Sequence, residues 1–227
     1  APARKGYSGV QTDEAGRVLS LAGKPDADPA RIAGSHLFTG CHIINEALLD
    51  RIPGDRPSDM VRDVYRRLAG EGQLGSVIHD GFWWEFGSPA LYLQGTKLLL
   101  DLPPDERRDI AGHDPVHKLD LGVAAIGTGA RFHESARIEG YAALGFASYV
   151  SEGARLKDSV VMPEAWIGSC CRLERCIVAP GVELPAGFEM EEALICADPG
   201  PGTETPDWAL REGGLLLGPL DPASVVS

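Results

Sequence analysis

Residues 126–156 read IGTGARFHESARIEGYAALGFASYVSEGARL, and a period of six runs through them without a break. A large apolar residue opens every step, at Ile126, Phe132, Ile138, Leu144, Val150 and Leu156. A small residue follows four places after the first five of these, at Ala130, Ala136, Ala142, Ser148 and Ala154. Helices and alternating strands have periods of 3.6 and 2, so neither explains this pattern.

A three-sided solenoid does explain it. Each six-residue segment forms one flat side, with the apolar residue inside the prism and the small residue at a tight inward corner. Steps of five and six then continue the series at Val161, Ile167, Leu173, Val178 and Leu184. These eleven segments predict somewhat fewer than four turns of a left-handed parallel β-helix of hexapeptide repeats over residues 118–198. An irregular all-β sandwich is the alternative, and it leaves the constant phase of large and small positions unexplained.

The chain before the repeat alternates strand and helix patterns, which predicts an α/β lobe over residues 1–104. The strand-like stretches are a hairpin from Tyr7 to Leu21, residues 36–45, and LGSVIHDGFWWEFG at 74–87. Met60 to Leu68 has the spacing of an amphipathic helix, and Ser88-Pro89 is a cap signal for a second one.

The segment 105–117 is charged, rich in proline and without a period, which predicts a linker between the lobe and the solenoid. Residues 199–227 are expected to form a C-terminal tail. His113 and His117 are four residues apart, but Pro115 between them prevents the helix that would aim both at one zinc ion.

The composition restricts the compartment and the partners. A formal charge of −12 disfavours nucleic acid and anionic membranes, although a local lysine or metal can still hold a small phosphorylated molecule. The sequence has no signal-peptide pattern at its start and no apolar run that could cross a bilayer, so we expect a cytoplasmic location. Five cysteines without a C-x-x-C pair indicate reduced thiols, and Cys170 and Cys171 are expected to fill the solenoid and its wall.

Four short motifs lie in the α/β lobe: YSGV at 7–10, GKP at 23–25, FTG at 38–40 and WWEFGSP at 83–89. In this order they resemble the Tyr-Gly-Val, Glu-Lys-Pro, sugar-side strand and Trp-x-Asp-x-Gly-Thr-Pro motifs of sugar-1-phosphate nucleotidyltransferases, the NDP-sugar pyrophosphorylases. The solenoid makes the chain most similar to those like mannose-1-phosphate guanylyltransferase that end in a β-helix. The resemblance implies that the lobe is the C-terminal part of a Rossmann-like nucleotidyltransferase domain.

The resemblance also implies roles for individual residues. Gly9, Lys24, Thr39 and Gly40 would bind the sugar 1-phosphate, with the phosphate at Lys24, and the nucleoside triphosphate would be the second substrate. Glu85 would help to hold Mg²⁺ between the phosphates. The chemistry agrees, because a hard cation that bridges two phosphates needs carboxylate oxygens, and phosphoryl transfer depends on charge neutralisation.

Three departures from the family pattern accompany these matches. Gly23 replaces a glutamate, and Glu85 replaces an aspartate. The glycine-rich Gly-x-Gly-Thr-Arg loop that binds the nucleotide, and the aspartate that supplies another metal ligand, have no counterpart in these 227 residues. We therefore expect a fragment of a longer enzyme or an inactive remnant, and we expect this chain alone not to form a nucleotide sugar.

Two other functions remain open at this point. His133 is the only histidine within the repeat and would be the general base of a hexapeptide-repeat acyltransferase. A non-catalytic regulatory or scaffold subunit is the other possibility. In each case we expect homo-oligomers formed through the solenoid, whose coil ends and flat sides must be covered or paired.

Overall fold

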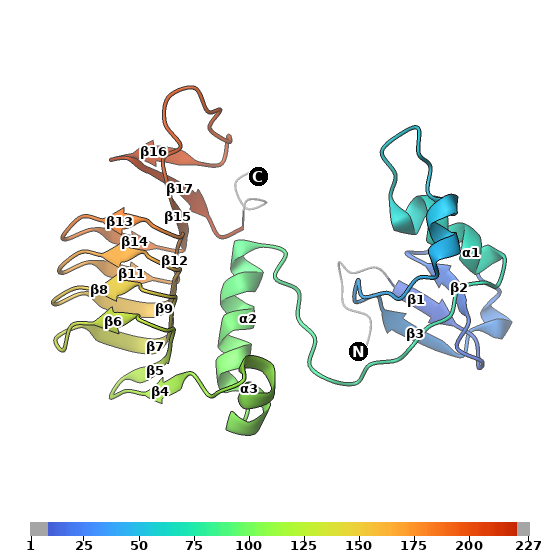
Figure 1. Cartoon of the computed structure of the whole chain (residues 1–227), viewed down its shortest axis with the longest axis horizontal. Helices are drawn as coiled ribbons and strands as arrows, with labels where there is room; N and C mark the ends of the chain where they lie inside the picture. Colours follow the sequence, from blue (N-terminus) through green and yellow to red (C-terminus); the bar gives the residue numbers. More distant parts are fainter. Residues whose placement is uncertain (1–8, 222–227) are drawn as a thin grey trace. The chain divides into compact units, whose positions relative to one another are not determined.

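A computed structural model describes residues 9–221, so Tyr7 and Ser8 of the first motif lie outside the described residues. The chain divides between Trp83 and Trp84 into two compact units, each of which has its own core (Figure 1). Within the described part, no helix combines the length and the apolar character that crossing a bilayer demands.

The first unit contains a three-stranded antiparallel sheet. The strands are β1 (Gly9–Thr12), β2 (Val18–Leu21) and β3 (Gly34–Leu37), in the order β2-β1-β3. Asp13 shapes the turn between β1 and β2, because its carboxylate accepts the backbone N–H groups of Ala15 and Arg17. The predicted hairpin is therefore confirmed for its described residues.

The Rossmann-like arrangement expected for this lobe is not shown by the sheet. Both of its strand pairs are antiparallel, whereas a Rossmann-like sheet is mostly parallel. Parallel neighbours need a crossover of a dozen or more residues, and the short turn at 13–17 can join only antiparallel strands. The unit is accordingly a small mixed α/β lobe.

The described residues of this unit also form short helices. They are the 3₁₀ helices η1 (Pro29–Arg31) and η2 (Glu46–Arg51), a π-helical turn η3 (Met60–Tyr65), and α1 (Arg66–Gly70). The predicted amphipathic helix is confirmed, since η3 and α1 form one continuous helix with Val64, Tyr65 and Leu68 buried. These side chains share a core with residues of β1 and β2.

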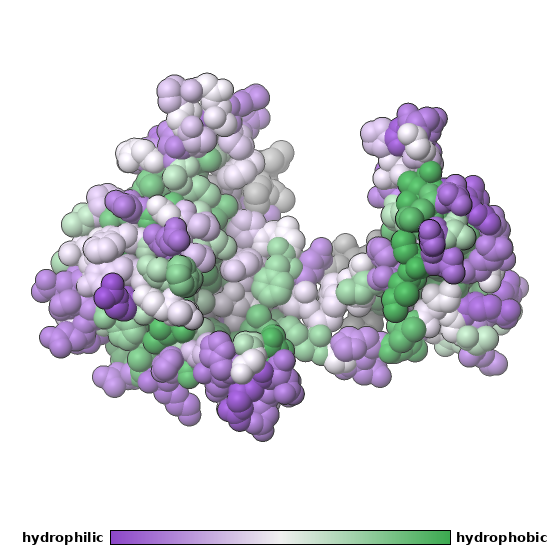
Figure 2. All heavy atoms as spheres, in the orientation of Figure 1, coloured by the Kyte–Doolittle hydropathy of each residue, from purple (hydrophilic) through white to green (hydrophobic). Residues whose placement is uncertain are grey.

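Two strand predictions in this unit are wrong. β3 ends at Leu37, so residues 38–45 are not strand, and 76–83 forms no strand either. Ile43 and Val77 consequently stand 101% and 94% exposed. Strand propensity reflects packing on a neighbouring strand, and neither segment has one among the described residues. Figure 2 shows hydrophobic residues gathered in a continuous strip on this unit.

The second unit is built on the predicted solenoid, which we describe by its three flat sides. Face A consists of four parallel strands, one in each coil. They are β6 (Arg131–Phe132), β8 (Tyr149–Val150), β10 (Trp166–Ile167) and β13 (Glu183–Leu184).

The longer strands β7 (Arg137–Leu144) and β9 (Arg155–Val161) bend across a corner and contribute to both other sides. Their first halves form face B with β11 (Arg172–Glu174) and β14 (Glu189–Glu191). Their second halves form face C with three more strands. These are β5 (Gly122–Ile126), β12 (Ile177–Val178) and β15 (Ala193–Ala197).

The interior of the prism follows the hexapeptide pattern. The periodic apolar side chains from Ile138 to Leu184 are at most 4% exposed, while Ile126 and Phe132 of the first coil are partly buried. Ala142 and Ala154 occupy fully buried corners. A solenoid of about four turns over residues 122–195 is thus confirmed. Cys171 is buried as expected, and Cys170 is exposed at a turn with φ +59°.

Antiparallel strands close face C at both ends. β4 (Val116–Lys118) pairs with β5, and β17 (Leu215–Pro219) pairs with β15 and with β16 (Leu210–Glu212). The predicted tail 199–227 therefore contains a hairpin that completes the solenoid. The apolar run LLLG of β17 explains this role, since Leu215 and Leu217 enter the core.

Helix α2 (Pro89–Asp101) covers the outside of face C (Figure 1). Leu93 packs on an outward column of one residue per coil. That column consists of Ala143, Val160, Ile177 and Leu194. The hydroxyl of Tyr141 donates to the Leu93 carbonyl at 2.9 Å, and burial raises the pKa of Tyr141 to about 12. Ser88 caps α2 as predicted, by accepting the N–H of Leu91. The helix thus belongs with the solenoid rather than with the lobe.

The predicted linker 105–117 is also ordered. It holds most of α3 (Pro104–Ala111) and runs into β4. The guanidinium of Arg107 binds both carboxylate oxygens of Asp114, at 2.7 and 2.8 Å, and also the carbonyls of Leu100 and Leu102. One side chain therefore fastens the end of α2, α3 and the approach to β4 together.

This contact predicts an acid-sensitive step in stability. Arg107 lowers the pKa of Asp114 from 3.8 to about 2, so the contribution is complete above about pH 4 and is lost as the pH falls through about 2. Urea unfolding at pH 5 should show Asp114→Asn to be less stable than the parent, and the difference should shrink steadily down to pH 2.

Asp105→Asn is the matched control, because Asp105 is 89% exposed beside Arg108. It should change the urea midpoint little at any pH. A difference between Asp114→Asn and the parent that stays constant from pH 5 to pH 2 would contradict the ion-pair assignment.

Candidate functional site

The antiparallel order of the sheet brings the predicted sugar-phosphate residues to one end of it. β1 starts at Gly9, which lies opposite Leu37 at the end of β3. The carbonyl of Gly9 also accepts the N–H of Ala22, just beyond the end of β2, at 2.8 Å. The turn that carries Lys24 and the segment that carries Thr39 and Gly40 therefore both leave the sheet beside Gly9.

Lys24 sits on a tight turn. Leu21 and Lys24 exchange two backbone hydrogen bonds, at 2.8 and 3.2 Å, and Gly23 between them has φ +74°, which favours glycine. The Lys24 side chain is 61% exposed, and its ammonium lies 3.1 Å from a carboxylate oxygen of Asp26. This cation is thus held on a fixed backbone and is reachable by an anionic ligand.

Arg66 fixes the Lys24 turn through two hydrogen bonds to its backbone. This residue was not identified from the sequence. Its Nε and Nη2 donate to the carbonyls of Leu21 and Ala22, at 3.3 and 3.1 Å. The one sequence feature that could have indicated Arg66 is its position in the predicted amphipathic helix, where a charged residue stands between the apolar Tyr65 and Leu68. Arg66 is therefore a positioning residue for the Lys24 turn.

The Thr39–Gly40 segment is fixed by an indole. Nε1 of Trp83 donates to the carbonyl of Thr39 at 3.2 Å, and the Thr39 hydroxyl accepts the N–H of Cys41 at 3.4 Å. Gly40 has φ +80°, a conformation that side chains with a β-carbon rarely adopt. His42 then meets the ring of Tyr65 edge-on, with centroids 5.5 Å apart. Burial raises the pKa of Tyr65.

Glu85 belongs to the second unit, whereas the four predicted sugar-phosphate residues belong to the first. Its neighbours are anchored on α2: Nε1 of Trp84 donates to the carbonyl of Leu91 at 2.9 Å, and Phe86 meets the ring of Tyr92 edge-on at 5.5 Å. Glu85 itself is exposed and lies against Gly87, where an added β-carbon would come within 3.1 Å of its carboxylate.

The metal-binding capacity around Glu85 is small. In residues 9–221, no three His, Cys, Asp or Glu side chains gather in a way that could hold a metal ion. Mg²⁺ in nucleotide sites is typically held by one or two carboxylates together with substrate phosphates and water. A single exposed carboxylate fits the donor chemistry of such an ion and supplies one part of its coordination.

The His133 side chain forms hydrogen bonds within the solenoid. Its Nδ1 accepts the backbone N–H of Ser135 at 3.2 Å and lies 2.8 Å from the Ser135 hydroxyl. That hydroxyl in turn accepts the N–H of Gly153 in the next coil, at 3.0 Å. These contacts stabilise a corner between two coils, so the structure adds no support for a general base at this position.

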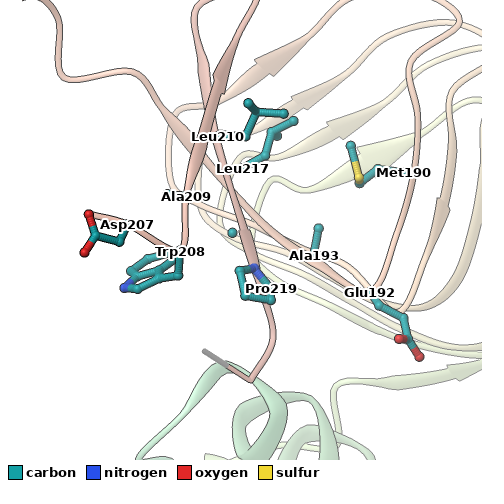
Figure 3. A pocket seen from close by; sticks show the side chains of 10 residues that line it. Met190, Glu192, Ala193, Asp207, Trp208, Ala209, Leu210, Leu217 and Pro219 are labelled. Atoms are coloured by element: carbon teal, nitrogen blue, oxygen red, sulfur yellow. The ribbon is translucent and has the colours of Figure 1, made fainter. Parts of the chain in front are cut away.

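A hollow of about 380 Å³ lies at the C-terminal end of the solenoid (Figure 3). Met190 and Ala193 of the last coil and Trp208, Leu210 and Leu217 of the following segment line it. None of the predicted site residues is among its lining residues. Figure 3 shows the carboxylates of Asp207 and Glu192 turned away from the other side chains, so the hollow offers mainly apolar surface.

Comparison with known proteins agrees with both units. The family model described as "GlmU-like, C-terminal hexapeptide" matches residues 125–194, which are the coils. A probable mannose-1-phosphate guanylyltransferase 3 of Oryza sativa subsp. japonica is 27% identical over 213 residues, which cover 93% of this chain and 51% of that protein. The chain is a distant homologue of mannose-1-phosphate guanylyltransferases.

Other mannose-1-phosphate guanylyltransferases give the same result. Mannose-1-phosphate guanylyltransferase 1 of Arabidopsis thaliana is 25% identical over 92% of this chain, and the Mycobacterium tuberculosis enzyme is 25% identical over 75% of it. These matches cover 50% and 45% of the two proteins. The chain thus spans about half the length of these relatives. The resemblance inferred from the four motifs is confirmed at the level of distant homology.

Proposed function

We propose that this chain provides the sugar-phosphate side of a sugar-1-phosphate nucleotidyltransferase, joined to a β-helical module. The reaction would convert a nucleoside triphosphate and a sugar 1-phosphate into an NDP-sugar and pyrophosphate. The names of the relatives favour mannose 1-phosphate as the sugar phosphate. The observation that carries the proposal is the convergence of Gly9, Lys24 and the Thr39–Gly40 segment at one end of the β2-β1-β3 sheet.

Each residue has a role that its surroundings support. The ammonium of Lys24 would pair with the phosphate of the sugar 1-phosphate. The phosphate would compete with the carboxylate of Asp26 for this ammonium. Gly9 and Gly40 lack side chains, and an added β-carbon at either would meet nothing within 4 Å, so a sugar ring can approach the backbone there. The Thr39 hydroxyl would donate to a sugar oxygen while it continues to accept the N–H of Cys41.

Glu85 would contribute a carboxylate to Mg²⁺ in the complete enzyme. The ion, when bound, neutralises charge on the phosphates and holds them in line for transfer. The role of Glu85 is to place one negative oxygen at the N-terminal end of α2, beside Trp84 and Phe86, which fix the segment on that helix.

The nucleotide-binding half would complete the first unit. Two exposed apolar pairs support this, Ile43 with Ile44 and Val77 with Ile78, on a unit whose surface carries a hydrophobic strip (Figure 2), because gathered apolar surface marks a site of interaction. A Rossmann-like organisation would then be a property of the completed domain. We further propose a cytoplasmic enzyme that self-associates through its solenoid.

Binding of mannose 1-phosphate tests the proposal directly on this chain. Titration monitored by amide NMR should shift the signals of Gly9 and Gly40, with saturation in the millimolar range or below. Lys24→Gln should weaken the affinity roughly tenfold or more, because it removes a charge-assisted contact with the phosphate.

Lys97→Gln is the matched control, since Lys97 is a comparably exposed lysine that pairs with Asp101 at 2.5 Å on α2. It should leave the affinity unchanged. Equal binding by Lys24→Gln and the parent, or no shift at Gly9 and Gly40 with tens of millimolar ligand, would overturn the assignment.

A further inference from the structure

Exposed large hydrophobic side chains in the coils are confined to one region. Between residues 122 and 195, all of which the structure describes, these are Phe146 and Trp166, at 54% and 51% exposure. Trp166 points outward from face A and packs on Tyr149 of the coil before it, with ring centroids 4.6 Å apart and planes tilted by 43°. Phe146 lies at the corner that leads into face A, three residues before Tyr149.

The outward column of face A has opposite charges at its two ends. The strand register places its four residues in a row, one per coil, in the order Arg131, Tyr149, Trp166, Glu183. Among the contacts described for residues 9–221, neither Arg131 nor Glu183 has a side-chain hydrogen bond or an ion pair. The column is therefore an aromatic pair between an available cation and an available anion.

The other two faces differ from this one. Face C is covered by α2. Face B carries an outward column of Arg137, Arg155, Arg172 and Glu189, in which three arginines follow one another. If a second copy packed on face B in reversed order, Arg155 would meet another arginine. Of the three faces, only face A has exposed aromatic side chains together with a charge order that is complementary to its own reverse, because Arg131 would then lie opposite Glu183.

We propose that a second copy of this chain packs on face A about a two-fold axis between Tyr149 and Trp166. The axis reverses the order of the coils, so Tyr149 of one copy meets Trp166 of the other. It also places Arg131 of each copy opposite Glu183 of its partner, twice in the dimer. This inference rests on the proposed self-association and names the surface, the symmetry and the contacts.

The size of the surface sets the expected strength. Strands in a sheet are about 4.8 Å apart, so four coils give a face only about 19 Å high. Each side is about six residues long, or about 20 Å at 3.3 Å per residue, so the face covers about 400 Å². This is well below the roughly 800 Å² per partner of a standard stable interface. We therefore expect a weak dimer, with a dissociation constant in the micromolar range, whose energy comes mainly from the central aromatic side chains.

Charge reversal on the intact 227-residue chain tests the register. Sedimentation velocity from 5 to 500 µM should show the parent chain in monomer–dimer equilibrium. Arg131→Glu and Glu183→Arg should each weaken self-association at least tenfold, because like charges then face each other at both ends. An equimolar mixture of the two variants should dimerise about as well as the parent, since both of its charged contacts are again opposite in sign.

Two further variants separate this surface from others. Trp166→Ala should abolish the dimer, while Arg155→Glu on face B makes the same charge change as Arg131→Glu and should leave the dimer intact. Circular dichroism confirms the fold of each variant. A parent that remains monomeric at 500 µM, a trimer, or a mixture no more associated than the separate variants would overturn the proposal. None of these outcomes bears on the proposed binding of mannose 1-phosphate, because the NMR titration measures that binding separately.

Discussion

Replacement of Leu156 by alanine is expected to lower the free energy of unfolding of the solenoid by about 3 kcal/mol. Leu156 is fully buried in the second coil, where it pairs with Ile138 in the coil before and Leu173 in the coil after. The backbone of both neighbouring coils is hydrogen-bonded at that level, so the walls cannot collapse into the space that the leucine leaves. Urea unfolding followed by circular dichroism measures the loss.

Leu121→Ala is the matched control, because Leu121 is 57% exposed just before the first coil. It should cost well under 1 kcal/mol. Each coil contacts only its neighbours in the stack. In Leu156→Ala, hydrogen exchange should therefore accelerate first in the two adjacent coils, at residues 137–144 and 172–178. Equal losses for Leu156→Ala and Leu121→Ala would contradict the inward assignment of the hexapeptide positions.

The largest expected effect on activity concerns Glu85, in a protein that carries this chain together with a nucleotide-binding half. Glu85→Gln keeps the shape of the side chain but removes its charge. If Glu85 is a Mg²⁺ ligand, turnover should fall roughly a hundredfold or more, since both charge and geometry are lost from the transition state. The folding of the chain should hardly change, because Glu85 is exposed.

Glu85→Asp distinguishes a ligand from a bystander. It restores the residue that the resembling motif carries at this position, so turnover should be far closer to that of the parent. The concentration of Mg²⁺ required for half-maximal rate should also rise in Glu85→Gln. Near-normal turnover with unchanged Mg²⁺ dependence in Glu85→Gln would remove Glu85 from the metal site.

The solenoid could be predicted from the sequence because every segment of every coil needs one large inward apolar residue and one small corner residue. A residue such as Val150 fills the prism and Ala154 fits its corner, and the six-residue spacing records both demands. The α/β lobe was harder to predict. Residues 38–45 and 74–87 have the composition of strands, but strand formation requires a neighbouring strand, and local sequence does not reveal whether one is present. The hairpin at 210–219 was missed because its partner, β15, is itself part of the repeat.

The residues of the candidate site were proposed from motifs and their roles remain predictions, whereas the geometry that joins them could not be predicted. The motifs located Gly9, Lys24, Thr39 and Gly40, and the sheet order explains why they converge. Arg66 and the indole contact of Trp83 were not foreseen, because both act through backbone carbonyls, which leave no residue pattern.

The antiparallel strands β4 and β17 have a consequence for how these molecules can polymerise. A parallel solenoid with free ends could in principle continue from one molecule into the next and grow as a fibre. Here the hydrogen-bonding edge of β5 is already taken by β4, and that of β15 by β17. On face C, a coil from another molecule would therefore meet an antiparallel strand, β4 or β16, at each end of the sheet instead of the parallel edge of β5 or β15. The chain's own antiparallel strands thus interrupt the parallel ladder of face C at both ends, which disfavours continuation of the solenoid from one molecule into the next along that face.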